Sequence, residues 1–100
     1  FINTNRDRRV YPLLAGIVLI AQWHESSGFY VVIQHSKDDG LTYYSKYCHL
    51  ETMHVIEGDE VTTGRVLGEY GLVGKTTGAH VHVEFYNQDW TPVDYGEMIR

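Results

Sequence analysis

Residues 29–48 read FYVVIQHSKDDGLTYYSKYC, and this stretch decides the fold. Its beginning, residues 29–35, is a run of aromatic and β-branched side chains, which is typical of a buried strand. Residues 37–40 (KDDG) follow, and an Asp-Gly pair favours a tight hairpin turn because glycine tolerates a positive φ. Residues 41–48 are rich in tyrosine and predict the return strand. The stretch therefore predicts an antiparallel β-hairpin.

Short runs of similar composition surround this hairpin, separated by glycine or aspartate, and helical periodicity is weak throughout. Further strands are predicted at residues 10–11, 16–21, 61, 66–68 and 81–85. Residues 55–64 (VIEGDEVTTG) predict two tight turns around a short strand, and residues 90–100 predict a closing turn or a frayed helix. The chain is therefore predicted to be one all-β domain, residues 1–100, built as a small antiparallel β-sandwich or partly closed barrel with glycine-rich loops.

The composition is that of a globular protein and excludes several classes of function. Of the 100 residues, 43% are hydrophobic and 21% are charged, and the formal net charge is −5. An acidic chain is unsuited to the phosphate backbone, so no nucleic-acid partner is expected. The longest apolar run, residues 13–21, contains a glycine and is too short to span a bilayer, so no membrane insertion is expected in this segment.

The single cysteine, Cys48, cannot form an internal disulfide. It precedes His49, which raises the question of a nucleophilic pair. Adjacent residues of a strand point to opposite faces, so this imidazole is not placed to act as a base for the thiol. Cys48 is therefore expected to be a buried small hydrophobe.

Six histidines occur in the chain, and the spacing of His80 and His82 is the informative one. In a strand these two side chains share one face, roughly 6.5–7 Å apart, while Val81 and Val83 point to the other face. Two such imidazoles can serve one metal ion, or one can bind the metal while the other transfers protons. Two exposed strand histidines without a function are the alternative. A further histidine, His49, ends the tyrosine-rich strand.

The surrounding motifs resemble those of a known family. Residues 47–50 (YCHL) match a Tyr-x-His-Leu element, residues 55–64 match Val-x-x-Gly-Asp-x-Val-x-x-Gly, and residues 77–84 match Thr-Gly-x-His-x-His-x-Glu. Residues 31–35 match the family's Val-x-Ile-x-His strand. Together, over residues 10–94, these motifs resemble the zinc endopeptidases typified by lysostaphin and LytM, which cut peptide cross-links of bacterial cell walls.

The resemblance implies a zinc cofactor and a role for several side chains. It implies that His82 is a metal ligand and that His80 and His49 are catalytic histidines beside the metal. It also implies a structural role for His35. Glu84 shares the strand face of the pair and is expected either to hold a histidine by a hydrogen bond or to be solvated.

The same resemblance implies a substrate and a location. The substrate would be peptide cross-links of peptidoglycan, cleaved by metal-activated water in a groove walled by glycine-rich loops, residues 71–78. Because this substrate lies outside the cytoplasm, the chain would act in the periplasm, at the cell surface, as a secreted protein or in a phage particle. His24 and His54 match no catalytic position and are expected to lie on the surface.

One part of the family pattern is missing from the sequence. The other two zinc ligands come from a His-x-x-x-Asp element that would end at or just before Phe1, and Asp7 has no histidine four residues earlier. Either the chain begins downstream of that element, or it is a metal-free relative that binds wall peptides or regulates a cell-wall amidase. Retention of His49, His80 and His82 favours the first interpretation. With one ligand zinc would bind weakly, so the hundred-residue chain alone is predicted to have little activity.

Overall fold

The computed structural model describes residues 8–37, 40–71 and 82–94, and eight strands lie within these ranges. They are β1 (Arg9–Val10), β2 (Gly16–His24), β3 (Gly28–Ser36), β4 (Thr42–Met53), β5 (Glu60–Val61), β6 (Gly68–Tyr70), β7 (His82–Asn87) and β8 (Pro92–Val93). The described ranges contain no helix, and so none that could cross a membrane. The all-β prediction is confirmed.

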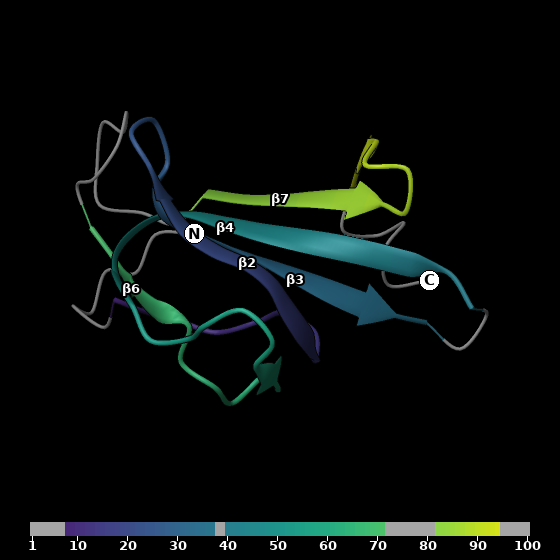
Figure 1. Cartoon of the computed structure of the whole chain (residues 1–100), viewed down its shortest axis with the longest axis horizontal. Helices are drawn as coiled ribbons and strands as arrows, with labels where there is room; N and C mark the ends of the chain where they lie inside the picture. Colours follow the sequence, from purple (N-terminus) through teal and green to yellow (C-terminus); the bar gives the residue numbers. More distant parts are fainter. Residues whose placement is uncertain (1–7, 38–39, 72–81, 95–100) are drawn as a thin grey trace.

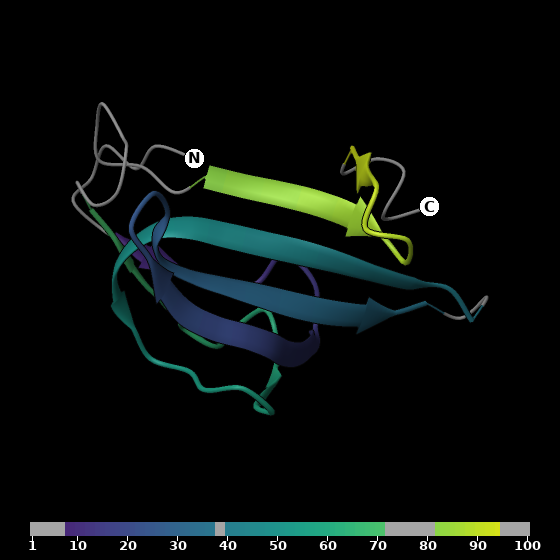
Figure 2. The same cartoon turned by 45° about the horizontal axis from the view of Figure 1, so that its top comes forward.

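All strands belong to one antiparallel sheet with the order β1-β6-β4-β3-β2-β5, and β7 pairs with both β4 and β8. Figure 1 shows the long strands β2, β3, β4 and β7 side by side. Figure 2 shows that this layer is curved, with the segment that follows β4 lying on one side of it. The sheet is therefore the partly closed barrel of the prediction rather than a sandwich of two sheets.

The hairpin that the sequence predicted is formed by β3 and β4. Val31 pairs with Tyr47 and Ser36 pairs with Thr42, so the register follows the turn between them. The two aspartates of that turn lie outside the described residues, whereas Gly40 has a φ of 84° and supplies the positive value that the turn needs. Strand β4 continues to Met53, past its predicted end at residue 48, because a different neighbouring strand pairs with its second half.

The core lies between one face of the sheet and the returning segment 54–70. Strands β3 and β4 contribute Val31, Ile33 and Tyr47, and the returning segment contributes Val61 and Leu67. Leu67 is fully buried, and burial of such a side chain contributes about 1.5–3 kcal/mol. The predicted pair of turns around a short strand is confirmed, since β5 lies between turns at residues 57–58 and 63–64.

A chain of hydrogen bonds crosses the polar part of this core. The amide of Leu13 donates to the Tyr47 hydroxyl (3.0 Å), which lies 2.9 Å from the Ser45 hydroxyl. Ser45 Oγ lies 2.7 Å from His35 Nε2, and His35 Nδ1 lies 2.8 Å from the carbonyl oxygen of Ala15. A carbonyl can only accept, so Nδ1 carries the proton, and in a neutral ring Nε2 then accepts from Ser45. Tyr47 must therefore donate to Ser45, which leaves its oxygen to accept from Leu13.

This assignment of donors and acceptors belongs to the neutral imidazole of His35. Burial lowers the pKa of His35, against the smaller opposing effect of its hydrogen bond to Ala15. The side chain is 3% exposed and ties the segment before β2 to β3 and β4. These contacts agree with the structural role expected for this histidine.

Candidate active site

Two of the three histidines singled out in the sequence lie together on neighbouring strands. His49 belongs to β4, and His82 is the first residue of β7, where it pairs with Cys48. The ring centroids are 6.2 Å apart and the ring planes are inclined at 64°. His80 lies outside the described residues, as do residues 72–78 of the glycine-rich segment. Two imidazoles at this separation can both contact one small molecule, such as a water.

His49 lies at the point where β4 changes its neighbour. Residues 43–48 of β4 pair with β7, whereas residues 50–53 pair with β6. The register with β3 also shifts here, between the pairs Val31–Tyr47 and Phe29–Leu50. Such a bulge redirects a side chain out of the regular alternation of a strand. The prediction from simple alternation therefore does not apply to His49.

The backbone of His49 is held in an uncommon conformation. Its φ is 65°, in the left-handed region, where a side chain costs about 1–2 kcal/mol relative to right-handed backbone. The amide donates to the carbonyl of Ser27 (2.6 Å), and its own carbonyl accepts from the amide of Gly71 (3.3 Å). Strain of this kind persists where the surroundings hold the residue, and it is found preferentially at functional sites.

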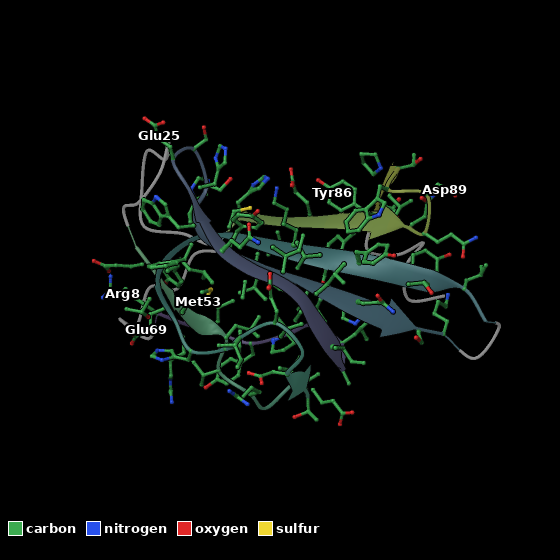
Figure 3. The ribbon with its side chains drawn as sticks, viewed as in Figure 1. Arg8, Glu25, Met53, Glu69, Tyr86 and Asp89 are labelled. Carbon is green, nitrogen blue, oxygen red and sulfur yellow. The ribbon has the colours of Figure 1, made fainter. Side chains whose placement is uncertain are left out.

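His82 is oriented by a carboxylate on its own strand face. Its Nε2 lies 3.2 Å from Glu84 Oε2, and Glu84 Oε1 accepts from the Tyr86 hydroxyl at 2.8 Å. Figure 3 shows Tyr86 on β7. Because a carboxylate accepts, Nε2 carries the proton, and the lone pair of the neutral ring is on Nδ1. This is the arrangement in which a carboxylate fixes the ring of a metal-binding histidine.

Charge and burial determine the protonation of these two partners. Burial alone would raise the pKa of Glu84, but the hydrogen bonds from Tyr86 and His82 and the charge of Lys46 together lower it. Lys46 Nζ lies 3.9 Å from Glu84 Oε1. Burial and the hydrogen bond to Glu84 raise the pKa of Tyr86 to about 12. Glu84 is therefore an ionised acceptor and Tyr86 a protonated donor near neutral pH.

The other residues discussed from the sequence take no part in this cluster. Cys48 is buried, and that burial raises the pKa of its thiol, so it is a protonated small hydrophobe as expected. His24 and His54 are exposed, as expected. Val83 packs against the core, as alternation along the strand predicted.

The described residues fit one part of a metal site. Within residues 8–37, 40–71 and 82–94, no group of three or more His, Cys, Asp or Glu side chains could hold a metal ion. His82, with its ring fixed by Glu84, is a suitable nitrogen donor for zinc. The described side chains thus supply a donor and its support, but not a complete coordination shell.

Two side chains near the site were not singled out from the sequence. Tyr86 lies two residues beyond Glu84, and the period of two along a strand could have placed both on one face. Lys46 pairs with Glu84 across β4 and β7, and this contact depends on a register between segments almost forty residues apart. No local pattern indicates that register.

Comparisons with known proteins show the family of this chain. The model of Peptidase family M23 matches residues 1–95. The peptidoglycan DD-endopeptidase ShyA of Vibrio cholerae is 40% identical over 75 residues, which are 75% of this chain and 16% of that protein. The chain thus spans about a sixth of the length of that relative.

Solved structures show the same fold. A zinc containing peptidase from Vibrio cholerae matches with a TM-score of 0.75 and 32% identity, over 86% of this chain and 25% of that one. The catalytic domain of lysostaphin from Staphylococcus simulans matches with a TM-score of 0.78 over 99% of this chain and 74% of that one. At 23% identity, the lysostaphin match shows similarity of fold.

Proposed function

This chain belongs to peptidase family M23, and from that membership we propose that it is the β-domain of a zinc-dependent endopeptidase that cleaves peptide cross-links of bacterial peptidoglycan. Relatives from Vibrio cholerae that are named peptidoglycan DD-endopeptidases support the substrate class. Because that substrate lies outside the cytoplasm, the proposed location is the periplasm, the cell surface, the medium or a phage particle.

The observation that carries the proposal is the convergence of His49 and His82 where β4 changes its neighbour. A bulge and a left-handed residue bring His49 to His82. Such a conformation is unfavourable in itself, so a fold that retains it gains something from the position of the side chain. A pair of adjacent imidazoles is suited to hydrolysis, because imidazole can both accept and donate a proton near neutral pH.

In the proposed site, His82 would hold zinc through its free ring nitrogen Nδ1, since Nε2 donates its proton to Glu84. A bound zinc ion would supply Lewis-acid polarisation of the scissile carbonyl and make water more acidic. The role of the chain's own residues is to position and to transfer protons. His49 would hold the attacking water or the developing oxyanion by a hydrogen bond, and the same role is proposed for His80.

The test separates metal binding from catalysis in the purified protein that contains this chain. Zinc content is measured by mass spectrometry, and cleavage is measured on purified cross-linked muropeptides. We expect His82→Ala to lose zinc, and His49→Ala to keep zinc while cleavage falls by about 100-fold or more. His24→Ala, at an exposed histidine outside the cluster, is the matched control and should retain both.

Each outcome has a defined meaning. Cleavage by the wild-type protein after complete removal of zinc would contradict the proposed cofactor. A protein that neither contains zinc nor cleaves muropeptides, yet binds wall peptides or a cell-wall amidase, would instead be a metal-free module. Full cleavage by His49→Ala would remove that residue from the proposed mechanism.

A further inference from the structure

The turn between β7 and β8 carries an exposed tryptophan at a position where glycine is favoured. The amide of Trp90 donates to the Asn87 carbonyl (2.9 Å), and the Asn87 amide donates to the Thr91 carbonyl (3.0 Å). Trp90 itself has a φ of 62°. A hairpin of this kind ends in a left-handed residue, which is usually glycine because it has no Cβ. A tryptophan there carries a conformational penalty, and its side chain is 46% exposed.

The indole is held in a fixed orientation by two tyrosines. The Trp90 ring stacks on Tyr44 with centroids 3.8 Å apart and planes inclined at 12°, and it lies 5.8 Å from the Tyr86 ring. Tyr44 and Tyr86 are directly paired across β4 and β7. The turn below the ring is itself fixed, because Asn87 Oδ1 accepts from the amides of Asp89 and Thr91. The result is a rigid aromatic surface with part of the indole open to solvent.

This aromatic surface lies on the same side of the sheet as the two histidines. His82, Glu84 and Tyr86 alternate along β7 and contact one another in sequence, so they share one face. From His82 to Tyr86 is four residues of strand, or about 13 Å. Figure 3 shows Tyr86 at the end of β7 that leads to the turn, with Asp89 beyond it.

We propose that Trp90, supported by Tyr44 and Tyr86, is a stacking subsite for a sugar ring of the peptidoglycan glycan strand, on the premise that the proposed function is correct. One face of a pyranose ring presents C–H groups, whose partial positive charge suits the negative face of an aromatic ring. Gln88 and Asp89, in the same turn as Trp90, are exposed polar residues of the kind that bind sugar hydroxyls.

The spacing agrees with the chemistry of such a substrate. A stem peptide of about four residues links the sugar to the cross-link and spans roughly 13–14 Å when extended. That span matches the distance along β7 between the proposed zinc ligand and the aromatic surface. A cross-link bound at the histidines would therefore place its own sugar beside Trp90.

A protein partner is a poorer match to the same surface. Protein-docking sites present contiguous apolar area. Among the described residues, most of the other large exposed hydrophobics belong to β2 and the turn after β4: Ile17, Leu19, Trp23 and Ile56. Leu41 lies in the β3–β4 turn, just before the first residue of β4. Among the described residues 82–94, Trp90 is thus the one large exposed hydrophobic side chain.

The first experiment measures sugar binding without reference to catalysis. The protein is titrated with a tetramer of β-1,4-linked N-acetylglucosamine, and the indole N–H resonances are followed by NMR. We expect the Trp90 resonance to shift in a saturable manner while that of Trp23, which is 55% exposed on β2, stays in place. Equal shifts at both tryptophans, or none at either, would overturn the proposal. A Trp90-dependent dimer in sedimentation velocity would also overturn it, in favour of a second copy of the chain.

The second experiment compares two substrates that differ in the sugar. Cleavage is measured on a cross-linked peptide with its disaccharides and on the same peptide without them. Glycine suits the left-handed backbone at residue 90. In Trp90→Gly, kcat/KM for the peptide with its disaccharides, divided by kcat/KM for the peptide without them, should fall about three- to tenfold. The control Trp23→Phe should keep the wild-type ratio, and an unchanged ratio in Trp90→Gly would refute the subsite.

The two experiments also distinguish this proposal from the one it rests on. If the protein binds the tetrasaccharide at Trp90 but cleaves neither peptide, the sugar subsite stands and the endopeptidase proposal fails. If Trp90→Gly cleaves each of the two peptides as well as the wild type does, and no tetrasaccharide binds, the endopeptidase proposal stands and the subsite fails.

Discussion

The buried hydrogen-bond chain around His35 makes stability depend on pH in a defined direction. Folding lowers the pKa of His35 from its ordinary value of 6.5, mainly through burial. Below pH 6.5 the unfolded chain therefore binds more protons at this residue than the folded chain does. The free energy of unfolding should then decrease as pH falls, and the stabilisation is fully present only above pH 6.5. One proton limits the slope to about 1.4 kcal/mol per pH unit.

The structure also explains why the protonated ring fits poorly. With a proton on Nε2, His35 would donate to Ser45, which must then donate to Tyr47. The Tyr47 hydroxyl would then accept from Ser45 as well as from the amide of Leu13, instead of donating to Ser45. Protonation of His35 thus reverses the direction of these side-chain hydrogen bonds as well as placing a charge in the core.

The assay is urea unfolding followed by circular dichroism between pH 5 and pH 8, with a chelator present so that proton competition at a metal site does not contribute. The comparison is His35→Gln, which cannot titrate but retains an amide donor and acceptor. We expect the wild-type advantage over this variant to shrink as pH falls below 6.5. Parallel stability curves for the two proteins would refute the argument that His35 is buried in the neutral form.

Three further predictions concern the site and the sheet. His49→Gly should be about 1 kcal/mol more stable than His49→Ala in urea unfolding, because glycine accepts the left-handed backbone; the reverse order would show that no strain is stored there. Glu84→Gln should weaken zinc binding about 10- to 100-fold in a chelator competition, and unchanged affinity would mean that Glu84 does not orient His82. Gly68→Ala should lower the free energy of unfolding by about 1–3 kcal/mol, because a Cβ there would overlap the carbonyl oxygen of Thr52. Gly64→Ala is the control, because a Cβ at that position makes only an ordinary contact with Thr62 Oγ1 at 3.9 Å.

Local patterns in the sequence were sufficient for the sheet but not for the direction of its side chains. The apolar run at 29–35 and the tyrosine-rich run at 41–48 predicted the β3–β4 hairpin, because strand propensity and turn chemistry act between near neighbours. The conformation of His49 has another origin. It depends on the change of partner from β7 to β6, and these strands come more than fifteen residues later in the chain. A contact of that range leaves no local signature.

The candidate site likewise contains contacts that the sequence predicted and contacts that it did not. The alternation rule predicted that Glu84 shares a face with the histidine pair, and its hydrogen bond to His82 follows from that rule. The contact between Lys46 and Glu84 required the register of β4 and β7, which the sequence does not reveal. The stacking of Trp90 on Tyr44 likewise requires both a hairpin turn and that register. Chemistry carried within one strand was predictable, and chemistry shared between strands was not.

The change of neighbour along β4 gives one strand two separate tasks. Before His49, β4 places Tyr47 in the core and Lys46 on the site face, in regular alternation with β7 on its edge. After His49, Leu50 returns to the core and β6 replaces β7. If β4 were regular and paired with β7 throughout, the pleat would set the direction of every side chain. Residue 49 would then point to the same face as Tyr47, into the core. The bulge with its left-handed residue therefore frees one side chain from the core without breaking the strand. The strain at His49 is thus the structural condition for placing an imidazole beside His82.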